Sequence, residues 1–378
     1  MILSFGARNF YSFKESFEVD LTLNKKLSNG KGFASSFAIK GSNASGKTNV
    51  FKVLSFIKSY VVNSFTNMKP DEDILIESHF ANNEPIELFI VFLKNDIEYK
   101  YELVLKKQKV ISEKFYKKER RWTRIIWRNK NKIGSIGKYN DIKSMKLRDN
   151  ASFFSSAIQY DIKSINNFVE LFNSISTNVH AFGRDETNID YKTVTEFYYN
   201  NNNLFLFVKE ILKKSDTGID DIKIIKSENK ETGKNEYFPI FYFKVDEDEK
   251  FLTYFSQSSG TKELYLLLGH YKLALDRGTL LAMDEFDIKL HPDLLPMIVD
   301  WFEDSEINKN NAQFVFSTHN TEIMDKLGKY KVAFVNKKDN KSFLYRLDEI
   351  PGDILRANRP ILPVYNTGRI GGKPKIVS

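Results

Sequence analysis

Eight consecutive residues near the N-terminus have the types and spacing of a phosphate-binding loop, with two glycines and a Lys-Thr pair at fixed positions. Glycines let successive backbone N–H groups turn inward and form a concave site for an anion. Lys47 would reach the β- and γ-phosphates of a nucleotide, and the Thr48 hydroxyl would bind Mg²⁺. The alternative interpretation is a turn whose glycines occur by chance. The eight residues are Gly41, Ser42, Asn43, Ala44, Ser45, Gly46, Lys47 and Thr48.

The residues on either side of this loop favour the phosphate-binding interpretation. The apolar run 37–39 precedes it and predicts a strand. Strand, loop and helix in that order would place the phosphates at a helix N-terminus, where the dipole and free N–H groups favour an anion. We therefore predict a nucleotide site. The helix is predicted from apolar residues that recur at helical spacing, namely Val50, Val53, Leu54, Ile57 and Val61.

Two later apolar runs end in residues that could act on a bound nucleotide. Residues 280–283 lead directly into Asp284 and Glu285, and residues 314–316 lead into Ser317-Thr318-His319. Buried parallel strands would deliver such side chains to the carboxyl edge of a sheet. Asp284 would hold Mg²⁺ directly or through water, Glu285 would activate the attacking water, and His319 would polarise the γ-phosphate or that water. The alternatives are an exposed strand end for the acids and a structural role for the histidine.

The elements that must position these residues can be predicted from periodicity. Apolar and polar residues alternate over 1–8 and 17–23, and again over 86–92 and 97–105, which predicts antiparallel strands. Shorter strands are expected near residues 110 and 125. Together they would form an antiparallel β-subdomain attached to the P-loop core.

The middle of the chain changes character. Residues 161–215 are rich in Asn, and Phe168, Leu171, Phe172 and Ile175 recur at helical spacing, which predicts a small helical insertion. No heptad register persists, so a long coiled-coil arm is not expected. A β-hairpin over residues 222–245 should follow, and then a helix that starts after a Ser-x-Gly sequence at Ser258 and Gly260, before the strands already described.

The composition excludes several classes of protein. The 378 residues contain no Cys and five His, which excludes a disulfide scaffold, an Fe–S cluster and a Cys-ligated zinc, and disfavours a His-rich metal centre. No apolar run approaches the ~18 residues that span a bilayer, and no signal peptide is evident, so we expect a cytoplasmic protein without a membrane partner. The net charge of +8 permits contact with nucleic acid without establishing it.

Two charged stretches each allow two interpretations. The acidic run 246–249 could bind a metal ion, but a solvated hairpin turn is the favoured interpretation. Residues 106–132 hold twelve Lys or Arg against two acids, interleaved with aromatic residues that include Trp122 and Trp127. That mixture suits a surface that tracks phosphates and stacks bases. We favour a solvated face with charged edge strands that block aggregation.

The order of these motifs resembles that of the ABC-type ATPase superfamily: a P-loop, a Ser-x-Gly before a helix, an apolar run ending in Asp-Glu, and a histidine at a strand end. The loop GSNASGKTN, with Asn49 after the Lys-Thr pair, resembles the RecF/SMC branch. The sequences DEFDIKLHP at 284–292 and STHN at 317–320 resemble the small OLD-type, AbiEii-like ATPases of bacterial anti-phage and toxin systems. The tail at 367–374 is also similar to the tail of those proteins.

The resemblance implies further roles. Ser258 and Gly260 would be the signature that caps the γ-phosphate of an ATP bound by a second subunit. Gln159 would be the glutamine that senses Mg²⁺ and water, Asp287 would lie at the dimer contact, and His319 would be the switch histidine. OLD nucleases carry a Toprim domain after such an ATPase, and this chain has no room for one. A separate effector, a nuclease or toxin, is therefore expected.

These observations predict an α/β fold with an ABC/RecF-like P-loop ATPase core, an antiparallel β-subdomain and a small helical insertion. The predicted ranges are 1–160 and 216–378 for two ATPase lobes and 161–215 for the insertion. The expected activity is Mg²⁺-dependent ATP hydrolysis across a homodimer or higher homo-oligomer, which would switch the effector in anti-phage defence. Two alternatives stay open: a RecF-like ATPase that binds DNA in repair, and a P-loop kinase of a small molecule. Contact of the chain with DNA or RNA is possible.

Overall fold

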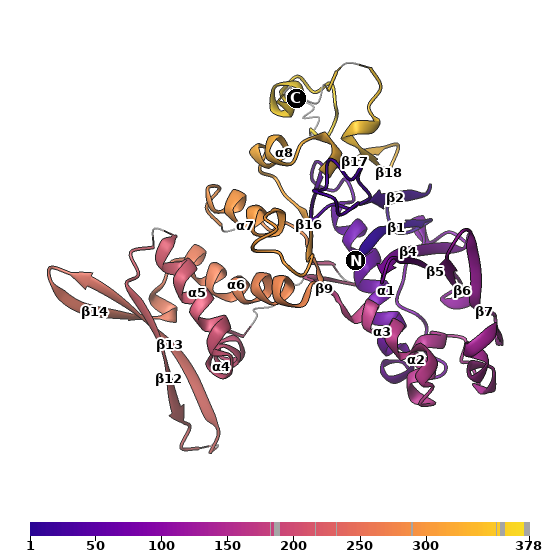
Figure 1. Cartoon of the computed structure of the whole chain (residues 1–378), viewed down its shortest axis with the longest axis horizontal. Helices are drawn as coiled ribbons and strands as arrows, with labels where there is room; N and C mark the ends of the chain where they lie inside the picture. The colour runs from indigo at the N-terminus through magenta and orange to yellow at the C-terminus, as the bar shows by residue number, and fades with distance from the viewer. Residues whose placement is uncertain are drawn as a thin grey trace. The chain divides into compact units, whose positions relative to one another are not determined.

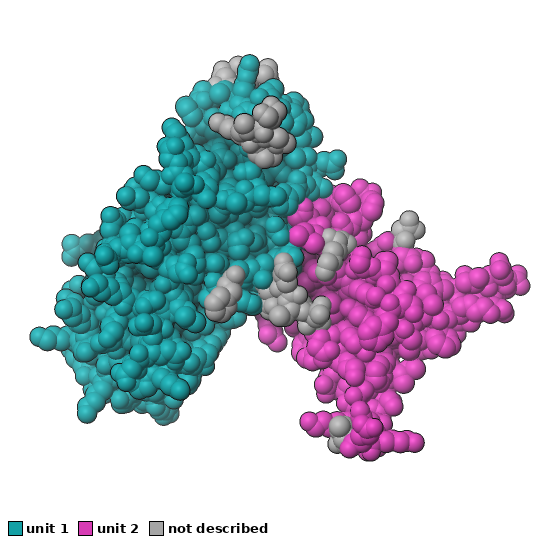
Figure 2. Space-filling view, turned by 180° about the vertical axis from the view of Figure 1, so that it is seen from behind, with its two compact units in different colours: residues 1–185, 279–286, 311–378 teal, residues 186–278, 287–310 magenta. Residues whose placement is uncertain are grey.

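The computed structural model describes residues 1–181, 183–184, 190–215, 217–231, 233–288, 290–352, 354–355 and 360–373. The tail residue Pro374 and Lys289 of the acidic motif lie outside them. The described residues form two compact units, which Figure 2 distinguishes by colour. Unit 1 comprises residues 1–185, 279–286 and 311–378, and unit 2 comprises residues 186–278 and 287–310. This partition differs from the three consecutive ranges predicted above, because spatial neighbours here come from distant parts of the chain.

The larger sheet of unit 1 is antiparallel and has the order β2-β1-β4-β5-β6-β7-β8. It contains the strands predicted from alternation, and the turn between β4 and β5 has Asn95 and Asp96 at positive φ, as a tight hairpin requires. The predicted antiparallel subdomain is confirmed. Its strands are β1 (Ile2–Arg8), β2 (Phe17–Asp20), β4 (Ile86–Lys94), β5 (Ile97–Lys106), β6 (Lys109–Lys118), β7 (Trp122–Asn129) and β8 (Lys132–Ser135).

The second sheet of unit 1 is mostly parallel and has the order β18-β17-β3-β16-β15-β9. The strands β3, β16, β15 and β9 run parallel to their neighbours, so their carboxyl ends lie at one edge. Strand β18 is antiparallel to β17 and forms the edge of the sheet opposite to β9. The strands are β3 (Ser36–Lys40), β9 (Ile175–Thr177), β15 (Leu280–Met283), β16 (Gln313–Ser317), β17 (Val332–Lys338) and β18 (Lys341–Arg346).

Helix α1 (Lys47–Asn67) belongs to the main apolar core of unit 1, which both sheets also join (Figure 1). All five apolar residues that predicted this helix are fully buried, and Phe51 and Tyr60 join them. Burying that many apolar side chains stabilises the helix far more than its propensity does. The other helices of unit 1 are α2 (Phe153–Gln159), α3 (Asn166–Asn173), α8 (Glu322–Leu327) and α9 (Ile361–Asn366).

Unit 2 combines helices with a three-stranded antiparallel sheet of order β12-β13-β14. Helix α4 contacts β13, and α5 contacts α6. The side chain of Tyr198 crosses onto α6 and donates a hydrogen bond to the Tyr265 carbonyl (2.7 Å). The elements are α4 (Tyr191–Asn200), α5 (Asn202–Lys214), β12 (Asp221–Glu228), β13 (Asn235–Val245), β14 (Asp248–Thr253), α6 (Ser259–Arg277) and α7 (Leu294–Glu303).

One prediction for the middle of the chain is wrong. Ile175, placed in a helix by its spacing from Phe172, begins strand β9, which pairs with β15. A small hairpin of β10 (Val179–His180) and β11 (Gly183–Arg184) follows. Three residues are too few to show alternation, and β9 forms because β15 lies beside it. The range 161–215 is therefore not purely helical.

Candidate nucleotide site

The predicted phosphate-binding loop connects β3 to α1. Gly46 has a φ of 112°, which L side chains rarely adopt, and it stands immediately before the first helical residue, Lys47. Gly41 is required for a different reason, since a Cβ there would lie 2.3 Å from the Val335 carbonyl oxygen. The two glycines therefore let the loop lead directly into the first turn of α1, and the N-terminal end of a helix favours an anion.

Neighbouring strands hold the loop in place. Ser342 of β18 donates a hydrogen bond to the Ser45 carbonyl (2.6 Å) and contacts the Ser12 hydroxyl (2.7 Å). Asn49 donates to the same Ser12 hydroxyl (2.8 Å). The ammonium group of Lys47 donates to the Gly41 and Ser42 carbonyls at 2.9 and 3.1 Å. These hydrogen bonds hold the loop against β18 and the turn after β1, and the Lys47 side chain bonds back to the start of the loop.

The parallel strands bring the acidic motif to this loop. Asp284 follows β15 and is 1% exposed. The Thr48 hydroxyl donates to its Oδ2 at 2.5 Å, and the Ser317 hydroxyl donates to its Oδ1. Ser317 also accepts from the Glu285 backbone N–H (2.7 Å). Three segments that are far apart in sequence therefore meet at one carboxylate.

Glu285 lies beside two basic side chains. Arg184 of β11 donates from Nη1 to Oε2 at 3.1 Å, and the His319 Nε2 lies 3.7 Å from Oε1. The Glu285 side chain is 31% exposed, so water can reach it. Its backbone has a φ of 53°, an uncommon value for a residue other than glycine. One carboxylate oxygen thus accepts from Arg184, and the other lies near His319.

The oxygen atoms at this point suit Mg²⁺. This ion prefers oxygen ligands, and in nucleotide sites it is held by one or two protein groups plus phosphates and water. Thr48 and Asp284 supply such a pair, since their oxygens are already in contact. Within the described ranges, no group of three or more His, Cys, Asp or Glu side chains could hold a metal ion without further ligands.

The sequence did not identify all of the residues at this site. Arg184 and Asn178 were missed: Asn178 donates to the Asp284 carbonyl (2.9 Å) and accepts from its N–H (2.8 Å). Neither belongs to a recognisable motif.

The structure does not place Gln159 at this site. It is exposed at the end of α2, and Ser155 of that helix bonds the backbone at Val62 and Phe65. Those residues are about 21 and 26 Å along α1 from Thr48, at 1.5 Å per residue.

The Ser-x-Gly sequence lies in unit 2. Ser258 is the N-cap of α6 and accepts a hydrogen bond from the Thr261 N–H (3.1 Å), and Gly260 lies in the first turn. Both line a cavity of about 660 Å³ together with His291. Asp287 belongs to the same unit. The N-terminal N–H groups and dipole of this 19-residue helix could bind an anion.

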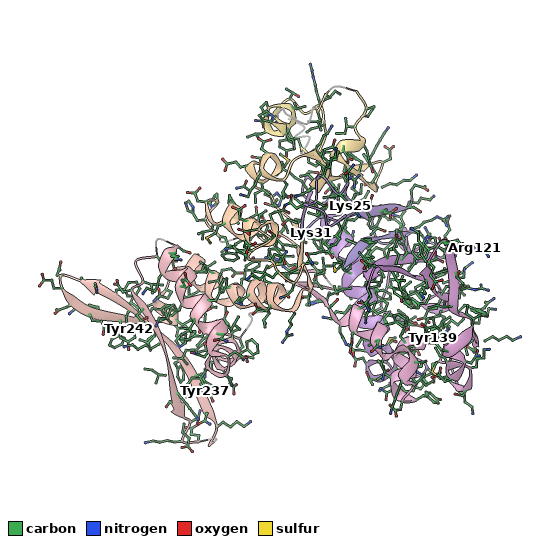
Figure 3. The ribbon with its side chains drawn as sticks, viewed as in Figure 1. Lys25, Lys31, Arg121, Tyr139, Tyr237 and Tyr242 are labelled. Carbon is green, nitrogen blue, oxygen red and sulfur yellow. The ribbon has the colours of Figure 1, made fainter. Side chains whose placement is uncertain are left out.

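The two charged stretches have structural positions. The acidic run forms the β13–β14 turn, with Asp246 and Glu247 at positive φ and exposed, so the hairpin interpretation is confirmed. The basic stretch forms β6, β7 and their turn, where Arg121 is exposed (Figure 3). Arg128 is buried and lies 3.6 Å from the buried Glu113. Burial raises the pKa of Glu113, and the Arg128 charge opposes this. One of the twelve cations is therefore part of the core.

Across the part of the chain that the structure describes, no helix is both long and apolar enough to cross a membrane.

Comparisons with solved structures show the fold class. An SMC head bound to the C-winged helix domain of ScpA has a TM-score of 0.50 and 14% identity, and covers 91% of this chain and 97% of that chain. The SMC head domain from Thermotoga maritima has a TM-score of 0.47 and 14% identity, and covers 91% of this chain and 98% of that chain. The recombination mediator protein RecF-ATPrS of the RecFOR pathway has a TM-score of 0.35 and 12% identity, and covers 91% of this chain and 98% of that chain. The first likeness supports the fold alone.

Comparisons of sequence give the family. No curated protein matches the chain. A family profile described as "AAA domain, putative AbiEii toxin, Type IV TA system" matches residues 36–325, which is more than half of the chain and includes the P-loop and the acidic motif. This match supports a P-loop ATPase, and the likeness to an SMC head shows its fold. The chain belongs to the AbiEii-like AAA domain family.

Proposed function

We propose that this chain is a Mg²⁺-dependent ATPase that works as a dimer and switches a separate effector in bacterial defence against phage. The observation that carries the ATPase part is the 2.5 Å hydrogen bond between Thr48 and Asp284, with Glu285 next in the chain. The P-loop hydroxyl, the metal-binding carboxylate and a solvent-accessible carboxylate are thereby at one sheet edge. Phosphoryl transfer to water requires such an arrangement.

Each residue has a role in this proposal. Lys47 binds the β- and γ-phosphates, and Thr48 and Asp284 hold the ion, which neutralises phosphate charge. Glu285 accepts a proton from the attacking water through the oxygen that Arg184 does not hold. His319, near that same oxygen, orients the water or the γ-phosphate.

The position of Ser258 supports the proposed dimer. It caps a helix that belongs to unit 2, and a resemblance to ABC-type ATPases implies that this helix end meets the γ-phosphate of another subunit. Two nucleotides would then hold two subunits together, and hydrolysis would release them. Such a cycle gives a partner two states to distinguish.

The defence role rests on the family description, which names a toxin of a toxin–antitoxin system. One structurally similar protein, an SMC head, was solved with a domain of another protein bound to it. Both support a role in which ATP controls a partner. We expect the effector to co-purify with the native chain, and to do so in an ATP-dependent way.

The experiment that tests the ATPase assignment is the Glu285→Gln substitution. The amide keeps the shape of the side chain but cannot take a proton, so kcat should fall by about 10²–10⁴-fold, the usual contribution of a general base. ATP binding, measured by equilibrium dialysis with Mg²⁺, should persist. Asp284→Asn should instead weaken the binding of Mg-ATP itself.

Glu18→Gln serves as the matched control, because Glu18 is an exposed glutamate on β2 of the same unit. Its turnover should equal that of the unmodified protein. Turnover of Glu285→Gln near the unmodified rate would contradict the assignment.

A further inference from the structure

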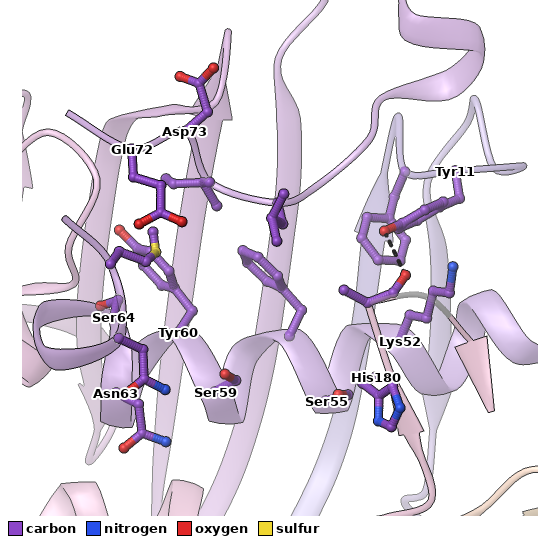
Figure 4. A pocket seen from close by; sticks show the side chains of 17 residues that line it. Tyr11, Lys52, Ser55, Ser59, Tyr60, Asn63, Ser64, Glu72, Asp73 and His180 are labelled. Atoms are coloured by element: carbon purple, nitrogen blue, oxygen red, sulfur yellow. Dashed lines mark hydrogen bonds between the residues drawn. The ribbon is translucent and has the colours of Figure 1, made fainter. Parts of the chain in front are cut away.

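Unit 1 contains a groove that the nucleotide site does not use. It has a volume of about 270 Å³ and follows α1, whose lining residues extend from Lys52 to Asn67 (Figure 4). That span corresponds to about 22 Å at 1.5 Å per residue. A groove of that length matches about seven residues of an extended peptide, at 3.3 Å each.

The lining of the groove combines a polar row with apolar side chains. Ser55, Ser59 and Asn63 stand four residues apart on α1, so they form one polar row along the helix. Phe56 of the same helix and Leu75 belong to the apolar part, and Leu75 is 61% exposed. An extended peptide turns alternate side chains to opposite sides and keeps its backbone polar groups available. It could therefore place apolar side chains against the apolar part and bond the polar row.

The ends of the groove carry opposite charges. Glu72 and Asp73 line one end, and Figure 4 shows them beyond Tyr60 and Asn63. Lys52 lines the other end, with its ammonium group 3.9 Å from the centre of the Tyr11 ring, near His180. A bound peptide with complementary charges would therefore carry a basic residue at the first end and an acidic residue at the second.

We propose that this groove binds a short extended segment of a partner protein, with an apolar centre, a Lys or Arg beside Glu72 and Asp73, and an Asp or Glu beside Lys52. The inference rests on the proposed function, in which the chain switches a separate partner. It adds the surface that the partner contacts and the chemistry of the segment that docks there.

The position of the groove suits that role. Helix α1 begins with Lys47 and Thr48 of the P-loop and reaches the groove five residues later. At the same end, Ala181 accepts a hydrogen bond from the Tyr11 hydroxyl (3.3 Å). Ala181 joins β10 to β11, whose Arg184 bonds Glu285. A segment in the groove would thus touch two elements that also build the nucleotide site.

The test is to select binders from a random heptapeptide display library on the purified full chain without nucleotide. We expect one sequence class with apolar central residues and opposite charges at its ends. The Ser59→Arg variant places a bulky charge in the polar row and should weaken its binding at least 10-fold by fluorescence polarisation. Thr66→Arg is the matched control, because Thr66 is exposed on the same helix and does not line the groove.

A charge exchange tests the orientation. In Asp73→Lys, selection should replace the basic end of the peptide with an acidic one. Asp71→Lys, an exposed neighbour outside the groove, should leave the selected class unchanged. Selected peptides that ignore Ser59→Arg, or whose charges ignore Asp73→Lys, would overturn the proposal, as would the absence of any selected class. Because binding is measured without ATP, such a failure leaves the ATPase assignment intact, and a failed Glu285→Gln test leaves the groove intact.

Discussion

Asp284 accepts hydrogen bonds from two hydroxyls, Thr48 and Ser317, that lie 236 and 33 positions away in the sequence. The sequence predicted the acids and the P-loop residues because phosphate and Mg²⁺ chemistry restricts residue types at short spacing. It could not predict Arg184, which reaches Glu285 across 101 positions from a two-residue strand. Contacts of that kind depend on the fold and leave no local pattern.

The position of Arg184 leads to a prediction about Glu285. Because its guanidinium bonds one oxygen of the Glu285 carboxylate, it fixes the orientation of the side chain that we propose as the general base. Arg184→Gln should lower kcat by roughly 10- to 100-fold, since small misplacements of a catalytic group cost about that much, while the KM for ATP changes little. Steady-state phosphate release would measure both constants.

Arg184→Lys should restore part of kcat, because it returns a positive charge to the carboxylate. Arg121→Gln, on the exposed β6–β7 turn, is the control and should behave like the unmodified protein. An unchanged kcat in Arg184→Gln would show that the ion pair has no part in hydrolysis.

Helices and strands could be predicted where their patterns are long. Helix α1 and the β4–β5 hairpin carry enough periodic positions to be recognised, whereas β9 has three residues and depends on β15 for its pairing. Gln159 shows a related difficulty: its position after an apolar run resembled a motif, but α2 packs near the C-terminal end of α1. Sequence order alone does not say which end of a helix a neighbour contacts.

The connection between β3 and α1 allows a test at this scale. Gly41→Ala would set a Cβ 2.3 Å from the Val335 carbonyl, so the loop must move away from β17. We expect at least 10-fold weaker Mg-ATP binding and a free energy of unfolding lower by about 1–3 kcal/mol, the usual cost of overpacking. Equilibrium dialysis and urea unfolding would measure these.

Gly137→Ala is a suitable comparison, because no atom lies within 4 Å of the added Cβ there; unlike Gly41, Gly137 has a positive φ (60°). It should lose some stability through backbone strain and keep full nucleotide binding. If Gly41→Ala binds Mg-ATP normally, the close approach of the loop to β17 is not required for the site.

For the whole molecule, the sequence predicted the fold class, and the similarity to an SMC head supports it. The interleaving of the two units could not be predicted. The chain leaves unit 1 after residue 185, returns for residues 279–286, and leaves again until residue 311. A strand as short as β15 joins its sheet through pairing with β16 and β9, which no composition change marks in the sequence.

The central claim is that each ATP site needs Lys47 of one subunit and Ser258 of another. Ser258→Arg places a bulky charge at the N-terminus of α6, where it opposes the helix dipole, and should abolish hydrolysis while its own P-loop still binds ATP. Lys47→Ala should abolish ATP binding. Each variant alone is then inactive.

Mixing these two variants and measuring phosphate release is the most direct test. A heterodimer pairs one intact P-loop with one intact Ser258, so activity should return, up to one working site per heterodimer. Analytical ultracentrifugation with one labelled variant would show that heterodimers form. Heterodimers that form and remain inactive would contradict the shared site and the dimeric switch built on it.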